Sequence, residues 1–226
     1  MTIFSEVVLN TNGGLRNTEF WKGMAQTGTR VIFAIDGLED TNHLYRRNVK
    51  WNKVIENVES FIKAGGKAEW DFLVFKHNQH QILEANRLSK KLGFDEFKLL
   101  QSDRWLGKKE LMPDREYVSD YYQHQESVLI DPNYQAGMAP ACIKNNVLTS
   151  TLYVDAEGDF YPCCWMGTYR YKYKSVFSPK GKKFNIKDNT LNQILENKNI
   201  KDFFESTKQF TSAHECCKIQ CGEKHV

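Results

Sequence analysis

The sequence contains no cysteine before residue 142, although it holds six cysteines in all. It also lacks any apolar run close to the roughly 18 residues that a membrane-spanning helix needs. Its first residues lack the basic segment and apolar core of a secretory signal. The formal net charge of +3 is too small to indicate a nucleic-acid partner by itself. We therefore expect a cytoplasmic protein with no membrane partner, and no binding to nucleic acid is expected.

The cysteines are confined to the last two-fifths of the chain. They are Cys142, Cys163, Cys164, Cys216, Cys217 and Cys221. In a reducing compartment, clustered cysteines are more often metal ligands than disulfides, and four or more thiolates suit zinc or an iron–sulfur cluster. Two adjacent cysteines do not easily bind one ion, so one member of each doublet is the expected ligand. The alternative is that several of them are small buried apolar residues.

The first half of the chain alternates short apolar runs with amphipathic helices. Residues 31–35 are apolar at every position, which is typical of a strand buried on both faces of a parallel sheet. Residues 6–10, 70–75 and 94–100 are the other predicted strands, with helices between consecutive strands. This alternation predicts parallel β-α-β units and an α/β fold with about four parallel strands.

Polar residues follow these strands directly. Asn12, Asp36, His77 and Asn78 come at or just after the predicted strand ends. Because α/β sheets and barrels place their sites at the carboxyl ends of parallel strands, this edge is the candidate site of the first half. Three histidines are expected to be exposed polar residues and not metal ligands: His77, His80 and His124.

The second half has a different organisation. Residues 102–139 are predicted to be a linker with a helix from Pro113 through Tyr122. Residues 140–226 are predicted to be a small cysteine-rich α+β domain, in which residues 151–161 form a β-hairpin around Glu157 and Gly158. Short helices are expected near Leu191 and Phe203.

The cysteine pattern resembles a known domain. Cys142-x15-Gly158-x4-Cys163, followed by a terminal cysteine knuckle, is similar to the auxiliary-cluster domain of radical S-adenosylmethionine (SAM) enzymes, in its Twitch or SPASM form. Upstream, residues 11–14 (TNGG) resemble the turn after the third strand of the radical SAM barrel. Residues 34–37 (AIDG), with Tyr45-Arg46 further on, are similar to the motif after the fourth strand.

The resemblance implies that residues 1–101 are strands three to six of a partial (β/α)6 radical SAM barrel. Two features of that barrel are missing from the sequence, the Cys-x3-Cys-x2-Cys motif and the GGEP-type turn, and Ala34 stands where many relatives have serine. We therefore expect either a truncated gene product or half of a split enzyme. A separate chain would then supply the first two β-α units and the catalytic cluster, and this chain alone would not be catalytic.

The resemblance also implies site residues. Asn12, Asp36, Arg46 and Asn78 would contact SAM, if the missing part is supplied. Each has an alternative: Asn12 and Asn78 satisfy turn backbone, Asp36 orients loop backbone, and Arg46 forms a surface salt bridge.

For an auxiliary [4Fe–4S] cluster the expected ligands are Cys142, Cys163, Cys217 and Cys221, with Cys164 and Cys216 as alternates. The implied function is that of the C-terminal, cluster-binding part of a radical SAM oxidoreductase-type protein acting on a peptide or small-molecule substrate. The alternative is a non-catalytic zinc-binding module that binds a protein or RNA partner. The two hypotheses differ in whether the bound metal is iron with sulfide or zinc alone.

Overall fold

The computed structural model describes residues 6–101, 110–118, 152–162, 166–167, 184–206 and 217. The chain divides into two compact units, Met1–Asp131 and Pro132–Val226, and each is described by itself. No described helix has the length and apolar character needed to cross a membrane.

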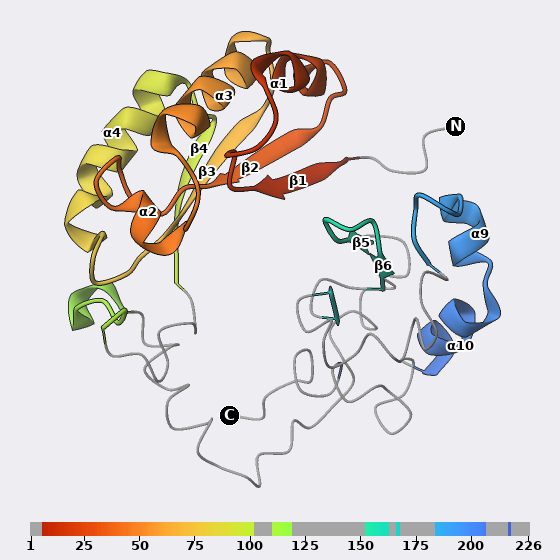
Figure 1. Ribbon diagram of the computed structural model, residues 1–226. Helices are drawn as coiled ribbons and strands as arrows, with labels where there is room; N and C mark the ends of the chain where they lie inside the picture. The colour runs from red at the N-terminus through yellow and green to blue at the C-terminus, as the bar shows by residue number, and fades with distance from the viewer. Residues whose placement is uncertain are drawn as a thin grey trace, which may run out of the picture. The chain divides into compact units, whose positions relative to one another are not determined.

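The first unit contains one parallel four-stranded sheet in the order β1-β2-β3-β4 (Figure 1). Its strands are β1 (Val8–Thr11), β2 (Arg30–Ala34), β3 (Ala68–Leu73) and β4 (Glu96–Leu100). Each strand pairs in parallel with the next in sequence, so every connection is a crossover. The predicted α/β fold with four parallel strands and intervening helices is confirmed.

The crossovers contain the helices α1 (Thr18–Ala25), α3 (Trp51–Lys63) and α4 (Ile82–Leu92). Asn17 caps α1, since its side chain accepts a hydrogen bond from the Phe20 amide at 3.0 Å. Gly93 ends α4 in the left-handed conformation with φ +89°. Two short elements were not predicted: α2 (Asn42–Tyr45) and the 3₁₀ turn η1 (Gln79–Gln81).

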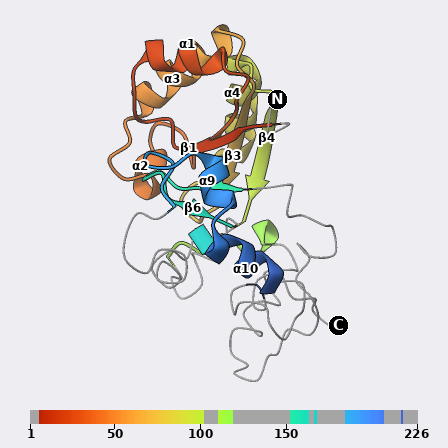
Figure 2. The same cartoon turned by 90° about the vertical axis from the view of Figure 1, so that its right-hand side faces the viewer.

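Side chains alternate between the two faces of the sheet. One face carries the core, and α1, α3 and α4 gather on that side (Figures 1 and 2). Its fully buried strand residues include Phe33, Trp70 and Phe72, which lie in one cluster with Val58 and Phe61 of α3. Because strand residues alternate, the intervening residues of β2 and β3 point to the opposite face of the sheet.

The segment after β4 differs in part from the prediction. Of the helix expected over residues 113–122, the described part is the 3₁₀ turn η3 (Arg115–Tyr117), followed by Val118 in an extended conformation. The turn is tied to the residue that follows β4, because the Gln101 amide Nε2 donates to the Tyr117 carbonyl at 2.6 Å. Residues 119–122 lie outside the described residues.

The second unit contains the predicted hairpin, formed by β5 (Tyr153–Val154) and β6 (Phe160–Tyr161) in antiparallel pairing. Two helices follow, α9 (Leu191–Leu195) and α10 (Lys198–Ser206). Thr190 and Gln193 form a capping box at the start of α9. The core of the unit consists of buried residues from the hairpin and both helices: Phe160, Tyr161, Met166, Phe184, Ile194 and Ile200.

Candidate functional site

The loops after β1, β2 and β3 form the candidate site of the first unit. The turn after β1 is organised by its own side chains: Asn12 Oδ1 accepts from the Gly14 amide and Thr11 Oγ1 accepts from the Gly13 amide, both at 3.0 Å. Asn57 of α3 is fully buried and donates to the Gly13 carbonyl at 2.7 Å. The turn is thus stabilised by its own side chains and by Asn57 of α3, and the Asn12 side chain bonds to the backbone of the turn.

Asp36 follows β2 and is fully buried. Its Oδ1 accepts from the Leu73 amide at 2.8 Å, and its Oδ2 accepts from Arg46 Nε at 2.5 Å. The first contact ties the end of β2 to the end of β3, and the second orients the guanidinium group. Asp36 therefore organises loop backbone, which is the alternative that the sequence left open, and it also positions Arg46.

Asn78 is also fully buried and joins the same two strand ends. Its Nδ2 donates to the carbonyls of Asp36 and Leu73, both at 2.9 Å, and its Oδ1 accepts from the Phe75 amide at 2.7 Å. Three of the bonds available to the side-chain amide are therefore taken by backbone. The structure brings Asn78, Asp36 and Arg46 together in one network.

The guanidinium group of Arg46 is engaged by Asp36 through one of its three nitrogens, Nε. Its side chain is 21% exposed, and its guanidinium lies 5.3 Å from the centre of the Tyr45 ring. Among the described residues, Nη1 and Nη2 have no hydrogen-bond partner. A guanidinium held by Nε to a buried carboxylate can present these two donors to an anionic group of a ligand.

His77 is more enclosed than the sequence indicated. Its ring stacks on Phe75 at 5.4 Å and 11°, and Phe75 in turn contacts Tyr45 at 4.4 Å. His77 Nε2 is buried without a hydrogen-bond partner among the described residues. Burial lowers the pKa of His77, with a further contribution from His80. The expectation of an exposed histidine is wrong for His77, because the aromatic ring beneath it covers one face. His80 is exposed as expected, and His124 lies outside the described residues.

The turn after Asp36 requires glycine at position 37, where φ is +141°. A Cβ there would lie 2.2 Å from Thr41 Oγ1 and 2.8 Å from the backbone nitrogen of Asn42. We expect Gly37→Ala to lower the free energy of unfolding by about 2–3 kcal/mol, because both the strained conformation and the contact with backbone must be accommodated. Urea unfolding followed by circular dichroism measures the change.

Gly23 offers the matched control for the same chemical change. It lies exposed inside α1, and a Cβ there would meet no atom within 4 Å. Gly23→Ala should raise the free energy of unfolding by about 0.5–1 kcal/mol, because alanine loses less conformational freedom in a helix. Equal effects of the two substitutions would contradict the assignment of strain to Gly37.

The face of the sheet opposite the helices carries charge, which sequence reasoning missed. Glu69 of β3 accepts from Arg30 Nη1 at 2.5 Å and from Lys98 Nζ at 2.7 Å. Burial alone would raise the pKa of Glu69, but the hydrogen bonds from Lys98 and Arg30 outweigh it and hold the pKa below its usual value. We call this side of the sheet, with Arg30, Glu69, Asp71 and Lys98, the charged face.

Asp71 lies on the charged face, two residues after Glu69 on β3. It is in register with Ala34 of β2 and Lys98 of β4. Its Oδ1 is buried and has no hydrogen-bond partner among the described residues. Burial raises the pKa of Asp71, and Lys98 opposes this in part. The one sequence signal was a carboxylate inside the otherwise apolar run 70–75.

In the second unit the hairpin turn is fixed by side chains. Asp155 Oδ1 accepts from the amides of Glu157 and Asp159 at 3.0 and 2.9 Å. Gly158 has φ +90°, and a Cβ there would lie 3.0 Å from Asn185 Oδ1. Gly158, the glycine of the Cys142-x15-Gly158-x4-Cys163 pattern, thus lies where the turn requires a left-handed residue with no side chain.

Of the expected cluster ligands, the described residues include Cys217, which is buried with 6% exposure. Cys142, Cys163 and Cys221 lie outside the described residues, as do the alternates Cys164 and Cys216. Close to Cys163 in sequence, Gly167 packs against Tyr153 so tightly that a Cβ would lie 2.2 Å from its ring. Within the described residues, no three His, Cys, Asp or Glu side chains are grouped to hold a metal ion.

Comparison with solved structures identifies the class of fold. Streptococcus suis SuiB bound to S-adenosylmethionine is 14% identical with a TM-score of 0.51, over 95% of this chain and 52% of SuiB. SuiB bound to the precursor peptide SuiA is 15% identical with a TM-score of 0.50, over 88% and 49%. Polyhistidine-tagged anSMEcpe with bound AdoMet is 14% identical with a TM-score of 0.46, over 97% and 64%. The fold is therefore similar to that of SuiB, a radical SAM enzyme.

The family comparison identifies the second half of the chain. Residues 142–222 match the SPASM family, an iron-sulfur cluster-binding domain. The predicted resemblance to radical SAM proteins with such a domain is confirmed, in its SPASM form. The matched range begins at Cys142 and includes all six cysteines. The chain spans about half the length of SuiB and 64% of anSMEcpe. No curated protein matches the sequence.

Proposed function

We propose that this chain is the part of a radical SAM enzyme that binds an auxiliary [4Fe–4S] cluster and contributes one side of the SAM site. The observation that supports it most is the SPASM match over residues 142–222, which includes every cysteine of the chain. The parallel sheet, with its polar carboxyl edge, adds the expected barrel part. We propose residues 1–101 as that barrel part, 102–139 as linker and 140–226 as the cluster domain.

The proposed cluster ligands are Cys142, Cys163, Cys217 and Cys221, with Cys164 and Cys216 as alternates. Thiolates are the ligands that iron–sulfur clusters take in proteins. The burial of Cys217 fits such a ligand, because a cluster site excludes water from its sulfurs. When bound, the cluster supplies electron transfer or a ligand position for substrate.

For SAM, the residue that fits best is Arg46. Its Nη1 and Nη2 donors are directed by the buried Asp36 carboxylate, and they suit the carboxylate or ribose of SAM. We propose that three residues support the SAM site without contacting SAM: Asp36, Asn12 and Asn78. Their contacts in the structure are to backbone or to Arg46. These three would hold the edge in shape around the cofactor.

The catalytic cluster would be bound elsewhere, because this sequence has no Cys-x3-Cys-x2-Cys motif. The first two β-α units and that motif would come from a longer form of the protein or from a separate chain. A peptide is the proposed substrate class, since SuiB of similar fold has been solved with a precursor peptide. By itself this chain would bind the auxiliary cluster and carry out no radical chemistry.

Anaerobic reconstitution with iron and sulfide tests the proposed function. We expect about four iron and four sulfide per chain, with the electron paramagnetic resonance signal of a reduced [4Fe–4S] cluster. One equivalent of zinc with no sulfide would contradict the proposal and favour a zinc-binding module. Measuring zinc in the purified chain before reconstitution separates the two outcomes.

A further inference from the structure

We propose that Asp71 is a specificity-determining residue that binds a cationic group of the substrate, such as the guanidinium of an arginine side chain in a peptide. The peptide as the ligand class rests on the proposed function. The choice of Asp71 rests on the geometry of the first unit alone.

The position of Asp71 leaves it without a partner from either neighbouring strand. In a parallel sheet, residues in register lie about 4.8 Å apart on the same face. On the β2 side this neighbour is Ala34, whose methyl group offers no donor. On the β4 side it is Lys98, whose Nζ lies instead on Glu69 at 2.7 Å and Glu96 at 3.0 Å. The donors next to Asp71 are therefore either absent or engaged.

The buried Oδ1 of Asp71 accepts no hydrogen bond from the described residues. A buried acceptor without a partner costs free energy, and a carboxylate costs more than a neutral group. Burial raises the pKa of Asp71 in the folded chain above its pKa in the unfolded chain. The protonated side chain therefore contributes fully to stability at a pH below the unfolded pKa, and this contribution is lost as the pH rises through the folded pKa. At a pH above the folded pKa the ionised side chain thus disfavours the folded state, which is typical of a group kept for binding or chemistry.

The charges around Asp71 favour a cation. The charged groups on this side are Arg30 and Asp36 from β2 and its end, Glu69 from β3, Glu96 and Lys98 from β4, and Glu6 before β1. Asp36 is paired with Arg46. The rest place three cations, Arg30, Lys98 and Lys67 before β3, among four carboxylates once Asp71 is included, an excess of one negative charge. This excess of negative charge attracts a cationic group to Asp71, whose Oδ1 has no hydrogen-bond partner in the described part of the chain.

The test uses the full chain labelled with ¹³C at the aspartate carboxyl carbons. We expect the Asp71 resonance, assigned by its loss in Asp71→Asn, to titrate above the usual aspartate range. Agmatine, which presents a guanidinium group, should shift this resonance in a saturable manner with a dissociation constant of about 1 mM. Urea at the same concentrations should not shift it, because urea has the same planar shape without the charge.

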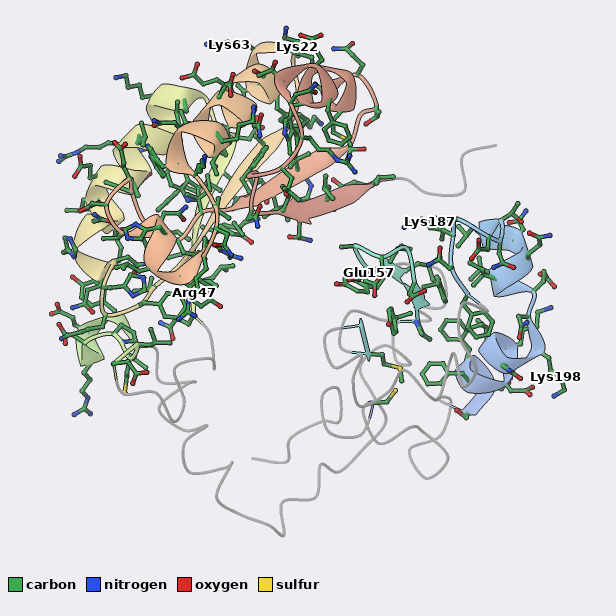
Figure 3. All side chains as sticks on the ribbon, viewed as in Figure 1. Lys22, Arg47, Lys63, Glu157, Lys187 and Lys198 are labelled. Carbon is green, nitrogen blue, oxygen red and sulfur yellow. The ribbon has the colours of Figure 1, made fainter. Side chains whose placement is uncertain are left out.

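Two variants and a control separate binding from a structural role. Asp71→Asn should weaken agmatine binding about tenfold or more, as observed on the agmatine resonances. The same substitution should raise the free energy of unfolding at neutral pH, and this gain should become smaller toward pH 4. Ala34→Ser, which places a hydroxyl in register with Asp71, should lower its pKa and weaken agmatine binding. Asp202, exposed and paired with Lys198 on α10 (Figure 3), should not respond to agmatine, and Asp202→Asn should leave the agmatine affinity unchanged.

A normal pKa with no response to agmatine would overturn the inference, and so would a loss of stability in Asp71→Asn at neutral pH. An equal response to urea would overturn the cationic class of the ligand. The experiment needs neither a cluster nor SAM, so its result is independent of the reconstitution. A chain that binds zinc and still responds to agmatine through Asp71 would contradict the proposed function and leave this site standing.

Discussion

Cys217→Ala is expected to remove most of the iron and sulfide that the reconstituted chain binds. Loss of a supporting group around a metal site costs roughly 10–100-fold in affinity, and loss of a ligand itself should cost more. Cys217 is the expected ligand of its doublet and is buried in the second unit. Iron and sulfide analysis after gel filtration, with the visible absorbance of the cluster, measures the loss.

The adjacent cysteine provides the matched control. Cys216→Ala removes a thiol one position away and should leave the iron content close to that of the unsubstituted chain. The reverse result, with Cys216 essential and Cys217 dispensable, would move the ligand to the alternate residue. If both variants kept a full cluster, neither cysteine would be a ligand and the proposed ligand set would be wrong.

Asp36→Ala is expected to loosen the contact between the carboxyl ends of β2 and β3. The change leaves the Leu73 amide without its acceptor and Arg46 without its carboxylate. We expect the free energy of unfolding to fall by about 2–4 kcal/mol. The value should lie toward the lower end of this range, because Arg46 is partly exposed and its guanidinium group can be hydrated instead. Hydrogen exchange of the Leu73 amide reports the change locally, with protection falling about 30-fold or more, since 1.4 kcal/mol corresponds to a factor of ten.

Two comparisons make this result specific. Asp36→Asn keeps an oxygen that can accept from the Leu73 amide, so its loss of protection should be smaller. Glu59→Ala removes an exposed i,i+4 pair with Lys63 on the outer surface of α3 (Figure 3) and should change stability by about 0.3–0.5 kcal/mol. Unchanged protection of Leu73 in Asp36→Ala would show that the carboxylate does not hold the strand ends together.

The strands and helices of the first unit were predictable because their signals are local. Residues 31–35 are apolar throughout, and β2 occupies this run with a shift of one residue. Asn17 and Gly93 mark helix ends through their own backbone chemistry. The helix predicted from Pro113 is reduced to the turn Arg115–Tyr117 over its described part, since contacts with the end of the sheet override helix propensity there.

The partners of the edge residues were not predictable. The sequence places Asp36 and Asn78 at strand ends and Arg46 ten residues after Asp36, but the bonds between them join segments up to 42 residues apart. The same holds for Glu69, which pairs with Arg30 and Lys98 from two other strands. A strand pattern shows which residues share a face, and the register across three strands decides which charges meet.

The sequence by itself determined two things: residues 142–222, with all six cysteines, match an iron-sulfur cluster-binding domain, and an alternation of strands and helices that makes a parallel sheet precedes them. Spacing and periodicity are properties of the chain, so they can be read without coordinates. Only the tertiary structure decided that Asp36 is the buried support of Arg46 and that Oδ1 of Asp71 is buried with no hydrogen-bond partner among the described residues. Both depend on burial and on which side chains meet across strands, and these arise when the crossovers bring distant segments into register.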